Sequence, residues 1–379
     1  MRVLGLMSGT SADGVDAVLA EFEGNPKQPK WNLINSLSVP YPGDLRQRIV
    51  DTGQGLKLSS NEWLDLVEAI TEVHAEAGRA CDPKNQSQIV GCHGQTVCHR
   101  PPCQSKRGAS MQLLQAPLLS QLLNRSVVFD FRAADLALGG EGAPLVPNAD
   151  AAIFGGLSGW RAILNLGGIS NLTLIPPTSG PDRFKAVLGW DCGPANSLVD
   201  LAVQKITNGV LAFDQDGLIA ANGSPQEEII ASWLKEPFFQ KPPPKSTGRE
   251  QFGLADLESR LKEISPISEE NLIATLTAFS AAVVANDLDK FYLKNNIRPI
   301  QLLVAGGGCR NPMMLNQLMK RCREVRVLTV EDLGIPIEAR EALAFALMAW
   351  WHILHYPGNS PAVTGAKRQV VLGVRVNPV

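Results

Sequence analysis

Two turns of this sequence combine glycine with small polar residues, a combination typical of phosphate-binding loops. The first covers residues 9–14, where Thr10 and Ser11 supply hydroxyl groups and Asp13 supplies a carboxylate that could hold Mg²⁺ beside the phosphates. The second is the glycine pair at residues 167–168. Glycine lets backbone N–H groups approach an anion without an intervening side chain. Each turn alone also fits an ordinary hairpin, but the two together favour a nucleotide site.

A third turn, the glycines at residues 306–308, lies between an apolar stretch and a helix expected to begin near Pro312. Such a place leaves room for the flat base or the ribose of a nucleotide. With Asn311, the turn matches a dinucleotide-binding fingerprint only in part. The sequence contains no Gly-x-x-x-x-Gly-Lys-Ser/Thr run. A protein of this sequence that binds ATP is therefore expected to hold the phosphates by hairpin turns and not by a P-loop.

Asp191 is the carboxylate with the most suggestive surroundings for general-base chemistry. Pro194 suits the first position of a helix, and the apolar residues that follow it recur at helical spacing, so Asp191 is expected at or just before a helix N-terminus. The helix dipole there favours the ionised carboxylate that a general base requires. A simple helix cap fits the same pattern, and the residues alone leave both interpretations open.

Arg132 and His93 are the candidates for contact with a polar substrate. Arg132 precedes a glycine-rich loop and could clamp a substrate carboxylate with two hydrogen bonds, or it could pair with Asp135 to hold that loop. His93 and Gln95 are expected to follow the end of a strand at residues 89–92, where their side chains offer the hydrogen-bonding groups that a sugar site needs. A purely structural histidine fits this position as well.

The same part of the chain has a cluster of potential zinc ligands: Cys92, His93, Cys98, His99 and Cys103. The cluster has no Cys-x-x-Cys pair, and no second cluster follows it. The preferred interpretation is a strand and loop that end at a polar pocket.

The elements that position these residues form an internal repeat. Residues 3–6 and 15–22 predict two strands around the first turn, and residues 162–166 and 172–175 predict two strands around the second. The repeat recurs after about 160 residues, much more than the period of a solenoid. It predicts two similar α/β domains that face each other across a cleft.

A length of 379 residues also favours two domains. We expect domain I at residues 1–135 and domain II at residues 136–379, with the C-terminal helix packing back on domain I. Helical spacing of apolar residues predicts helices at 62–81 and 269–292, and a strand is expected at 300–304.

The stretch 237–248 is rich in proline and fits neither a regular helix nor a central strand. It is expected to be a surface loop or a mobile lid.

Composition narrows the classes of function. The sequence has 35 Lys and Arg against 37 Asp and Glu, a formal charge of −2, so neither nucleic acid nor a membrane surface is an expected partner. The apolar runs at 272–286 and 342–356 are too short for membrane spans and predict core helices. The N-terminus does not have the pattern of a secretory signal, and seven cysteines without regular spacing favour the reducing cytoplasm and no structural disulfides.

Taken together, these segments resemble the anhydro-N-acetylmuramic acid kinase family, within the superfamily of sugar kinases, heat-shock proteins and actin. The resemblance runs from residue 5 to the region of residue 341. Its matching stretches are GLMSGTSADGVD, HGQTVCH, DFRAADLALGGEGAPLVP, NLGGISNLT, DCGPAN, STGREQFG and GGGCRNP. It implies two actin-like (ribonuclease H-like) domains around a nucleotide cleft, the use of ATP and Mg²⁺, and a homodimer.

The resemblance also implies a reaction. Water opens the 1,6-anhydro ring of 1,6-anhydro-N-acetylmuramic acid while the freed O6 takes the γ-phosphoryl group of ATP, which gives N-acetylmuramic acid 6-phosphate and ADP. The product enters peptidoglycan recycling or amino-sugar catabolism. Asp191 matches the general base of the family and Arg132 matches an arginine near the sugar. One carboxylate suffices because the phosphoryl group captures the leaving oxygen in place of a general acid.

The candidate site is therefore the following set. The expected ATP-binding residues are Gly9, Thr10, Ser11, Ala12, Asp13, Gly14, Val15, Asp16, Gly167, Gly168, Gly306, Gly307 and Gly308. The expected substrate-binding residues are Arg132, His93, Gln95 and Asn171, and the catalytic pair is Asp191 with Arg132. Asp13 is the candidate Mg²⁺ ligand.

The catalytic segment departs from the family pattern at two positions. The family commonly has Asp-Thr-Gly-Pro-Gly-Asn where this chain has Cys192 and Ala195. Ala195 requires a negative φ, which a first helical turn after Pro194 provides, so activity is expected to survive. Two alternatives are a kinase acting on a plain hydroxyl group of another amino sugar, and an actin-like ATPase of the chaperone or filament type.

Overall fold

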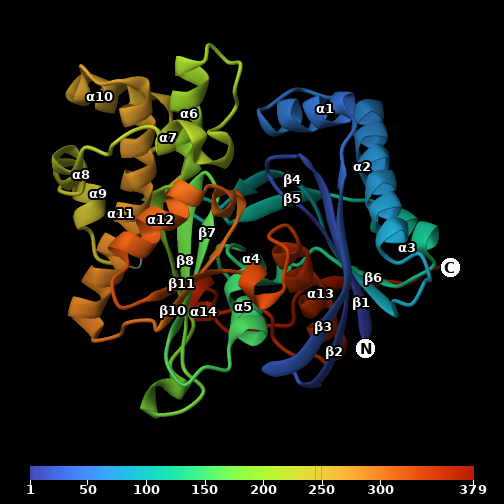
Figure 1. Ribbon diagram of the computed structural model, residues 1–379. Coiled ribbons are helices and arrows are strands. Elements are labelled where there is room, and N and C mark those ends of the chain that lie inside the picture. The colour runs from blue at the N-terminus through green and yellow to red at the C-terminus, as the bar shows by residue number, and fades with distance from the viewer. Residues whose placement is uncertain (244, 249) are drawn as a thin grey trace. The chain divides into compact units, whose positions relative to one another are not determined.

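The computed structural model describes residues 1–243, 245–248 and 250–379 (Figure 1). The chain forms two compact units. Unit 1 comprises Met1–Gly156 and Glu338–Val379, and unit 2 comprises Leu157–Ile337. Each unit has a mixed β-sheet with helices packed on it, which confirms the predicted α/β class.

The elements of unit 1 surround a sheet of seven strands. The strands are β1 (Arg2–Ser8), β2 (Gly14–Asn25), β3 (Gln28–Pro40), β4 (Ile89–Arg100), β5 (Ala109–Leu113), β6 (Val127–Phe129) and β12 (Val374–Val376). The helices are α1 (Gly43–Gly53), α2 (Ser60–Cys81), α3 (Ala116–Leu123), α4 (Ala133–Ala137), α5 (Val146–Phe154), α13 (Ala339–Ile353) and α14 (Pro361–Thr364).

The elements of unit 2 surround a sheet of five strands. The strands are β7 (Arg161–Leu166), β8 (Ile169–Ile175), β9 (Leu188–Pro194), β10 (Gln301–Ala305) and β11 (Arg326–Thr329). The α-helices are α6 (Asn196–Ile206), α7 (Leu218–Ala221), α8 (Glu227–Trp233), α9 (Pro237–Gln240), α10 (Leu254–Ile264), α11 (Glu269–Asn295) and α12 (Pro312–Arg321). Short 3₁₀ helices are η1 (Pro181–Phe184), η2 (Gln215–Gly217), η3 (Gly307–Arg310) and η4 (Glu331–Leu333).

The two sheets share one strand order, β3-β2-β1-β4-β6 in unit 1 and β9-β8-β7-β10-β11 in unit 2. In both, the first three strands form an antiparallel meander and the last two add in parallel. The remaining pairings of unit 2 follow the same pattern. The predicted internal repeat is thus confirmed as a duplicated, actin-like sheet.

The sheet of unit 1 is covered on both faces, by α2 and α3 on one side and α13 on the other (Figure 1). Side chains of a strand alternate between the faces. Leu4 and Leu6 accordingly belong to the core beneath α2, whereas Phe22 stacks on Trp350 of α13. On the α13 side, Gly5 and Gly91 are register partners in β1 and β4. Helix α13 therefore approaches the sheet over a strip without side chains.

The division of the chain lies after Gly156 and not at residue 135, and unit 1 includes the C-terminal helix that was expected to pack back on domain I. The buried Asp135 carboxylate accepts hydrogen bonds from Asn359 Nδ2 and Thr364 Oγ1, each at 2.7 Å. Arg340 of α13 forms a buried ion pair with Asp150 of α5. These contacts join segments about 200 residues apart, so local sequence patterns do not reveal them.

The long helices follow their sequence signals closely. Helix α2 begins after Ser59, which forms a capping box with Glu62. Helix α12 begins at Pro312, as predicted, and Asn311 caps it. Helix α11 is long and apolar enough to span a membrane, but 89% of its most apolar window is buried inside the protein. It is a core helix of unit 2, as its sequence predicts.

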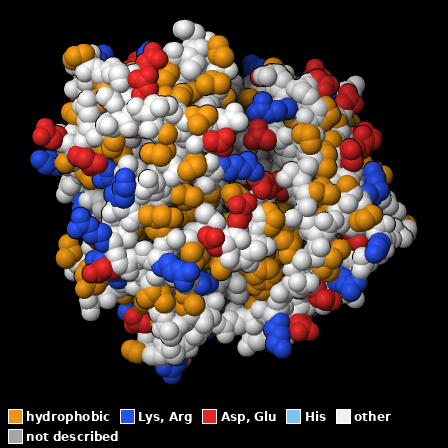
Figure 2. All heavy atoms as spheres, viewed as in Figure 1, with side chains coloured by type: hydrophobic (Ala, Val, Ile, Leu, Met, Phe, Trp, Pro, Cys, Tyr) orange, Lys and Arg blue, Asp and Glu red, His pale blue; other side chains and the backbone are white. Residues whose placement is uncertain are grey.

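The face of the molecule shown in Figure 2 carries lysine and arginine side chains interspersed with aspartate and glutamate. This mixture is consistent with the formal charge of −2.

Candidate active site

Asp191 lies inside strand β9 and not at a helix N-terminus. Strand β9 continues through Pro194, and α6 begins only at Asn196, with Ala195 as its N-cap residue at φ −111°. The strand persists because Gly193 and Pro194 still pair with β8, and proline is tolerated on this edge strand of the sheet. The predictions of a helix-terminal Asp191 and of Pro194 as the first helical residue are therefore wrong. The negative φ expected of Ala195 is confirmed.

Three polar residues form a row across adjacent strands of unit 2. Asp191 of β9 is the register partner of Asn171 in β8, and Asn171 is the partner of Asn165 in β7. All three are half-buried, whereas Trp190 and Cys192, the neighbours of Asp191, are buried in the hydrophobic core with α11. Because side chains alternate along a strand, the polar row lies on the sheet face opposite that core.

The Asp191 carboxylate is held by the segment that follows α9. Ser246 Oγ donates to Asp191 Oδ2 at 2.8 Å, and the backbone N–H of Thr247 donates to the same oxygen at 3.0 Å. The backbone N–H of Asp191 donates to the carbonyl oxygen of Lys245 at 2.9 Å. Among the described residues, no group donates a hydrogen bond to Oδ1 of Asp191. One carboxylate oxygen is thus fixed, and the other is available.

Burial raises the pKa of Asp191 above its ordinary value, while the hydrogen bonds from Thr247 and Ser246 lower it in part and the charge of Glu250 raises it further. A raised pKa increases the basicity of a carboxylate. Burial thus supplies the basicity that a helix N-terminus would have weakened.

We expect Ser246→Ala to move the acid limb of the pH–rate profile to higher pH. The serine hydroxyl stabilises the ionised form of Asp191, so its removal raises the pKa of that carboxyl further. The value of kcat/KM on the plateau at higher pH is expected to change much less. The measurement is kcat/KM from pH 4 to 9, with Ser232→Ala on the exposed side of α8 as the matched control. An unchanged acid limb would show that Asp191 does not govern it.

In the stretch 237–248, the described residues from Lys241 onwards form no regular helix or strand, as predicted, but the stretch is not simply a surface loop. It begins with the short helix α9, whose Phe238 and Phe239 are buried, and the side chain of Lys245 is only 4% exposed. Two residues of this region lie outside the described residues, Pro244 of the proline-rich stretch and Arg249 of the motif STGREQFG.

In unit 1, the hairpin of residues 9–16 presents some of its predicted phosphate-binding side chains and buries others. Thr10, Ser11 and Asp13 are exposed at its tip. Ala12 and Val15 are buried in the core, and Ala12 adopts a left-handed φ of +53°. Gly9, Gly14 and Asp16 are half-buried.

The glycines of the hairpin act through the backbone. A Cβ at Gly14 would lie 2.2 Å from the carbonyl oxygen of Val39, so the tight approach of β2 to β3 requires glycine there. The carboxylate of Asp16 accepts a hydrogen bond from Ser38 Oγ. Asp13 forms an exposed ion pair with Arg46 at 3.0 Å.

Gln95 braces this hairpin. Strand β4 does not end at Cys92 as predicted but continues to Arg100 past a register shift around Gly94, whose φ is +75°. The fully buried Gln95 accepts a hydrogen bond from Ser8 Oγ and donates to the carbonyl oxygen of Gly9 at 3.0 Å. Both ends of its amide are thus engaged inside unit 1.

Arg132 and His93 form a second polar group in unit 1. The guanidinium donates to His93 Nε2 from Nε at 3.2 Å and from NH2 at 2.9 Å, and to the carbonyl oxygen of Gly142 from NH1 at 2.7 Å. Asp135 instead accepts from the backbone N–H of Gly142. The alternative in which Arg132 pairs with Asp135 is therefore wrong, although both residues hold the glycine-rich loop.

His93 is a neutral acceptor in this arrangement. Burial, reinforced by the charge of Arg132, lowers the pKa of His93 to about 3. With Nε2 accepting from Arg132, the proton lies on Nδ1, which donates to the carbonyl oxygen of Gly94 at 2.9 Å. Burial lowers the pKa of Arg132, and the nearby charge of Glu341 raises it. Glu341 was missed by the sequence analysis because it lies just before the predicted core helix at 342–356, more than 200 positions further along the chain.

The two glycine turns of unit 2, at residues 167–168 and 306–308, differ in how open their backbone is to a ligand. The carbonyl oxygens of Gly167 and Gly168 accept from the backbone N–H groups of Ala195, Asn196 and Ser197. The start of α6 is thereby satisfied within the protein. In the third turn, a Cβ at Gly308 would meet Leu166 Cβ at 2.6 Å, and Gly306 has φ +81°. Gly307 alone of these three has no atom within 4 Å of an added Cβ, so a ligand can approach the backbone there.

The cluster of cysteines and histidines in β4 is dispersed by the strand. Cys92 is buried, whereas Cys98 and Cys103 are exposed. Within the part of the chain that the structure describes, no three His, Cys, Asp or Glu side chains form a group that could hold a metal ion.

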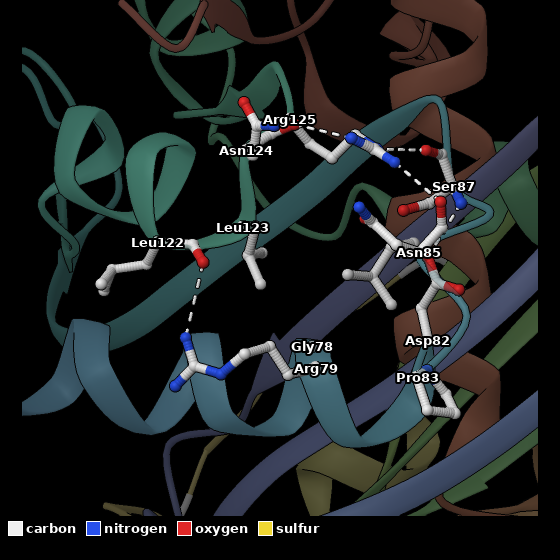
Figure 3. A pocket seen from close by; sticks show the side chains of 11 residues that line it. Gly78, Arg79, Asp82, Pro83, Asn85, Ser87, Leu122, Leu123, Asn124 and Arg125 are labelled. Carbon is white, nitrogen blue, oxygen red and sulfur yellow. Dashed lines mark hydrogen bonds between the residues drawn. The ribbon is translucent and has the colours of Figure 1, made fainter.

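A pocket of about 350 Å³ in unit 1 contains none of these candidates (Figure 3). Its two arginines bind backbone carbonyl oxygens, Arg125 those of Asn85 and Ser87 and Arg79 that of Leu122. These cations hold the turn after α2 and the end of α3 in place, which is a structural role.

Comparison with known proteins agrees with these motifs. The family model for anhydro-N-acetylmuramic acid kinase matches residues 1–378. The anhydro-N-acetylmuramic acid kinases of Prochlorococcus marinus (strain MIT 9313) and Synechococcus sp. (strain CC9902) are 68% and 61% identical to this chain, and each alignment covers 100% of both proteins. A solved xylulose kinase from Rhodospirillum rubrum is 12% identical with a TM-score of 0.46, over 100% of this chain and 94% of that one. This chain belongs to the anhydro-N-acetylmuramic acid kinase family.

Proposed function

We propose that this kinase hydrolytically opens the anhydro ring of 1,6-anhydro-N-acetylmuramic acid and transfers the γ-phosphoryl group of ATP to O6. The products are N-acetylmuramic acid 6-phosphate and ADP. The observation that carries the proposal is the Asp191 carboxylate, which has a raised pKa, one oxygen fixed by two donors and the other without a partner among the described residues.

The bonds and protons of this reaction balance with one protein base. Asp191 takes a proton from water, the water oxygen bonds to C1 of the sugar, and the C1–O6 bond breaks. O6 then bonds to the γ-phosphorus as the bond to ADP breaks. A base that activates water opposite the leaving oxygen is the arrangement of inverting glycosidases, and phosphoryl capture of O6 removes the need for a general acid.

The surroundings of Asp191 suit this role. Ser246 and Thr247 fix Oδ2, which leaves Oδ1 to orient the water. Asn171, the register partner of Asp191, makes no side-chain hydrogen bond to the described residues and is available to the sugar or the water. The neighbouring Cys192 points into the core, and burial raises its pKa well above the ordinary value, so it stays protonated and takes no part.

Arg132 is proposed to bind the lactyl carboxylate of the sugar. A guanidinium has five N–H groups, and three of them bind His93 and Gly142, which leaves one on each terminal nitrogen. Two remaining donors suit a carboxylate held by two hydrogen bonds. His93 orients the guanidinium, and we assign Gln95 to bracing the hairpin rather than to sugar contact.

The phosphates of ATP are assigned to the hairpin of residues 9–16 and to the backbone at residues 167–168 and 307. The donor chemistry at the hairpin also fits Mg²⁺, because this ion is usually held by one or two carboxylates together with substrate phosphates. Asp13 is exposed, and its ion pair with Arg46 is of a surface type that contributes little and exchanges easily. When bound, Mg²⁺ neutralises charge on the transferring phosphoryl group.

We expect Asp13→Asn to raise the Mg²⁺ concentration for half-maximal activity by about tenfold, the effect of one charge-assisted contact. The measurement is a Mg²⁺ titration at saturating ATP and sugar, with Asp65→Asn on the exposed face of α2 as the control. An unchanged Mg²⁺ dependence would remove Asp13 from the metal site.

The substrate is tested by ADP release from purified protein with ATP and Mg²⁺. The proposal predicts rapid release with 1,6-anhydro-N-acetylmuramic acid and little with N-acetylmuramic acid or N-acetylglucosamine. Equal rates with the ring-opened sugars would favour a kinase acting on a plain hydroxyl group. Slow release unaffected by any sugar would favour an ATPase of another kind.

We further propose that the enzyme works in the cytoplasm as a homodimer. Seven free cysteines, two of them exposed, suit a reducing compartment. Light scattering coupled to gel filtration tests the dimer, and a monomer at micromolar concentration would contradict it.

A further inference from the structure

Beneath Asp191, unit 2 contains a buried ion pair. Lys245 Nζ lies 2.8 Å from Asp287 Oδ1, and the two side chains are 4% and 0% exposed. Asp287 belongs to α11, the central helix of unit 2, and Lys245 directly precedes the two residues that donate to the Asp191 carboxylate. We propose that Lys245 and Asp287 are positioning residues that anchor residues 245–247 to α11 and thereby hold Asp191 in its catalytic geometry. The proposal rests on the role of Asp191 as the base.

The anchored segment holds Asp191 from two directions. The carbonyl oxygen of Lys245 accepts from the backbone N–H of Asp191, which ties the segment to the free edge of β9. Ser246 and Thr247 then donate to the side chain of Asp191. A displacement of Lys245 would therefore disturb the backbone and the carboxylate of Asp191 together.

The buried end of Lys245 is well fixed. Its ammonium lies 4.5 Å from the centre of the Phe238 ring and donates to the carbonyl oxygen of Phe238 at 3.4 Å. Phe238 and Phe239 pack with Phe252 in an aromatic cluster. Lys290 of α11 donates to the carbonyl oxygen of Phe239, which ties α9 to the same helix.

Asp287 also approaches the strand of the base. Burial raises the pKa of Asp287 to about 6, whereas Lys245 and, more weakly, the indole N–H of Trp190, the residue before Asp191, lower it. The contact is not a regular hydrogen bond, because Trp190 Nε1 and Asp287 Oδ2 are both buried without a partner at hydrogen-bonding geometry. Asp287 thus lies close to both Trp190 and Lys245.

A buried ion pair is weak evidence for stability, because desolvation of the charges offsets much of their attraction and apolar replacements are often as stable. This pair differs from a purely structural one because it anchors the segment that donates hydrogen bonds to the Asp191 carboxylate. A second ion group of unit 2, the buried Arg260 with Glu236 and Asp256, has no such link to Asp191 among the described residues.

The test compares Lys245→Met, Asp287→Asn and the double variant Lys245→Met/Asp287→Asn. Each single change leaves a buried charge without its partner and is expected to lower Tm by about 5 °C or more. The double variant removes both charges and is expected to regain most of that loss. Its kcat is nevertheless expected to stay about 30-fold below wild type, with the KM for the sugar within about threefold, as for a misplaced catalytic group.

Two further measurements separate positioning from general stability. Arg260→Met is the control, because it breaks a buried ion group but is expected to keep the wild-type kcat and pH–rate profile. Hydrogen exchange of the Asp191 and Thr247 amides reports the anchor directly, and both should exchange faster in the double variant while α11 remains protected.

The outcomes are distinct. Wild-type kcat together with unchanged exchange of the two amides in the folded double variant would overturn the anchor. Faster exchange at those amides supports the anchor even if Asp191→Asn keeps its activity, in which case the assignment of the base fails instead.

Discussion

Asp191→Asn is expected to lower kcat by about a thousandfold or more, because an amide cannot accept the proton of the attacking water. The change preserves the size of the side chain, and its carbonyl oxygen can still accept from Ser246 and Thr247. Glu258→Gln on the exposed side of α10 changes the protein's charge by the same amount and should leave kcat unaltered. A loss of activity smaller than tenfold would exclude Asp191 as the base.

The same substitution is expected to leave stability equal or higher at pH 7. Burial raises the pKa of Asp191 in the folded protein. The contribution of this carboxyl to the stability of the fold is therefore complete below pH 3.8, its ordinary pKa, and is lost as the pH rises through the folded pKa. At neutral pH the wild type therefore keeps a partly buried charge that asparagine lacks. Thermal unfolding at pH 7 and pH 4 checks this, because any advantage of the variant must shrink at the lower pH.

Gly91→Ala is expected to destabilise the protein by about 3 kcal/mol or more, as overpacking of a tight interface does. A Cβ at Gly91 would lie 2.3 Å from the carbonyl oxygen of Phe345 and 2.8 Å from Ala349 Cβ. The first of these atoms is backbone, so α13 would have to move away from the sheet. Gly5, the register partner of Gly91, faces the same helix at 2.1 Å from the carbonyl oxygen of Ala342.

Urea unfolding measures this effect. Gly43→Ala in α1 is the matched control, because a Cβ there meets nothing within 4 Å. It is expected to be neutral or slightly stabilising, since alanine favours a helix more than glycine does. A free energy of unfolding for Gly91→Ala within about 0.5 kcal/mol of wild type would show that α13 does not depend on the glycine strip.

Features with a local cause were predictable from the sequence. The repeated hairpins and the helices α2, α11 and α12 follow apolar periodicity and caps such as Ser59 and Asn311. The duplicated sheet followed from the repeat because each copy has two strands around a glycine turn.

Features with a distant cause were not predictable. Pairing with β8 carries β9 through Pro194, which moves Asp191 from a helix end into a strand. Contacts of Asp135 and Asp150 with the C-terminal part of the chain assign residues 136–156 to unit 1. The strip without side chains under α13, formed by Gly5 and Gly91, appears in the sequence only as two glycines inside apolar strands.

The residues of the candidate site could be proposed one by one from the sequence, but the contacts among them could not. The polar types of Arg132, His93 and Gln95 were visible, yet the bond from Arg132 to His93 and the bracing role of Gln95 depend on strands and loops that meet only in the fold. Lys245 lay in a stretch interpreted as a loop, because nothing local indicates that Asp287, in another predicted element, neutralises it.

The most direct test of the central claim is the fate of solvent oxygen. Purified protein is incubated with ATP, Mg²⁺ and 1,6-anhydro-N-acetylmuramic acid in ¹⁸O-water, and the product is analysed by mass spectrometry. Unlabelled N-acetylmuramic acid 6-phosphate incubated for the same time corrects for exchange at C1. The account predicts a phosphorylated product with one solvent oxygen at C1 from wild type and almost none from Asp191→Asn. A phosphorylated product without solvent oxygen, or no sugar-dependent phosphorylation, would contradict it.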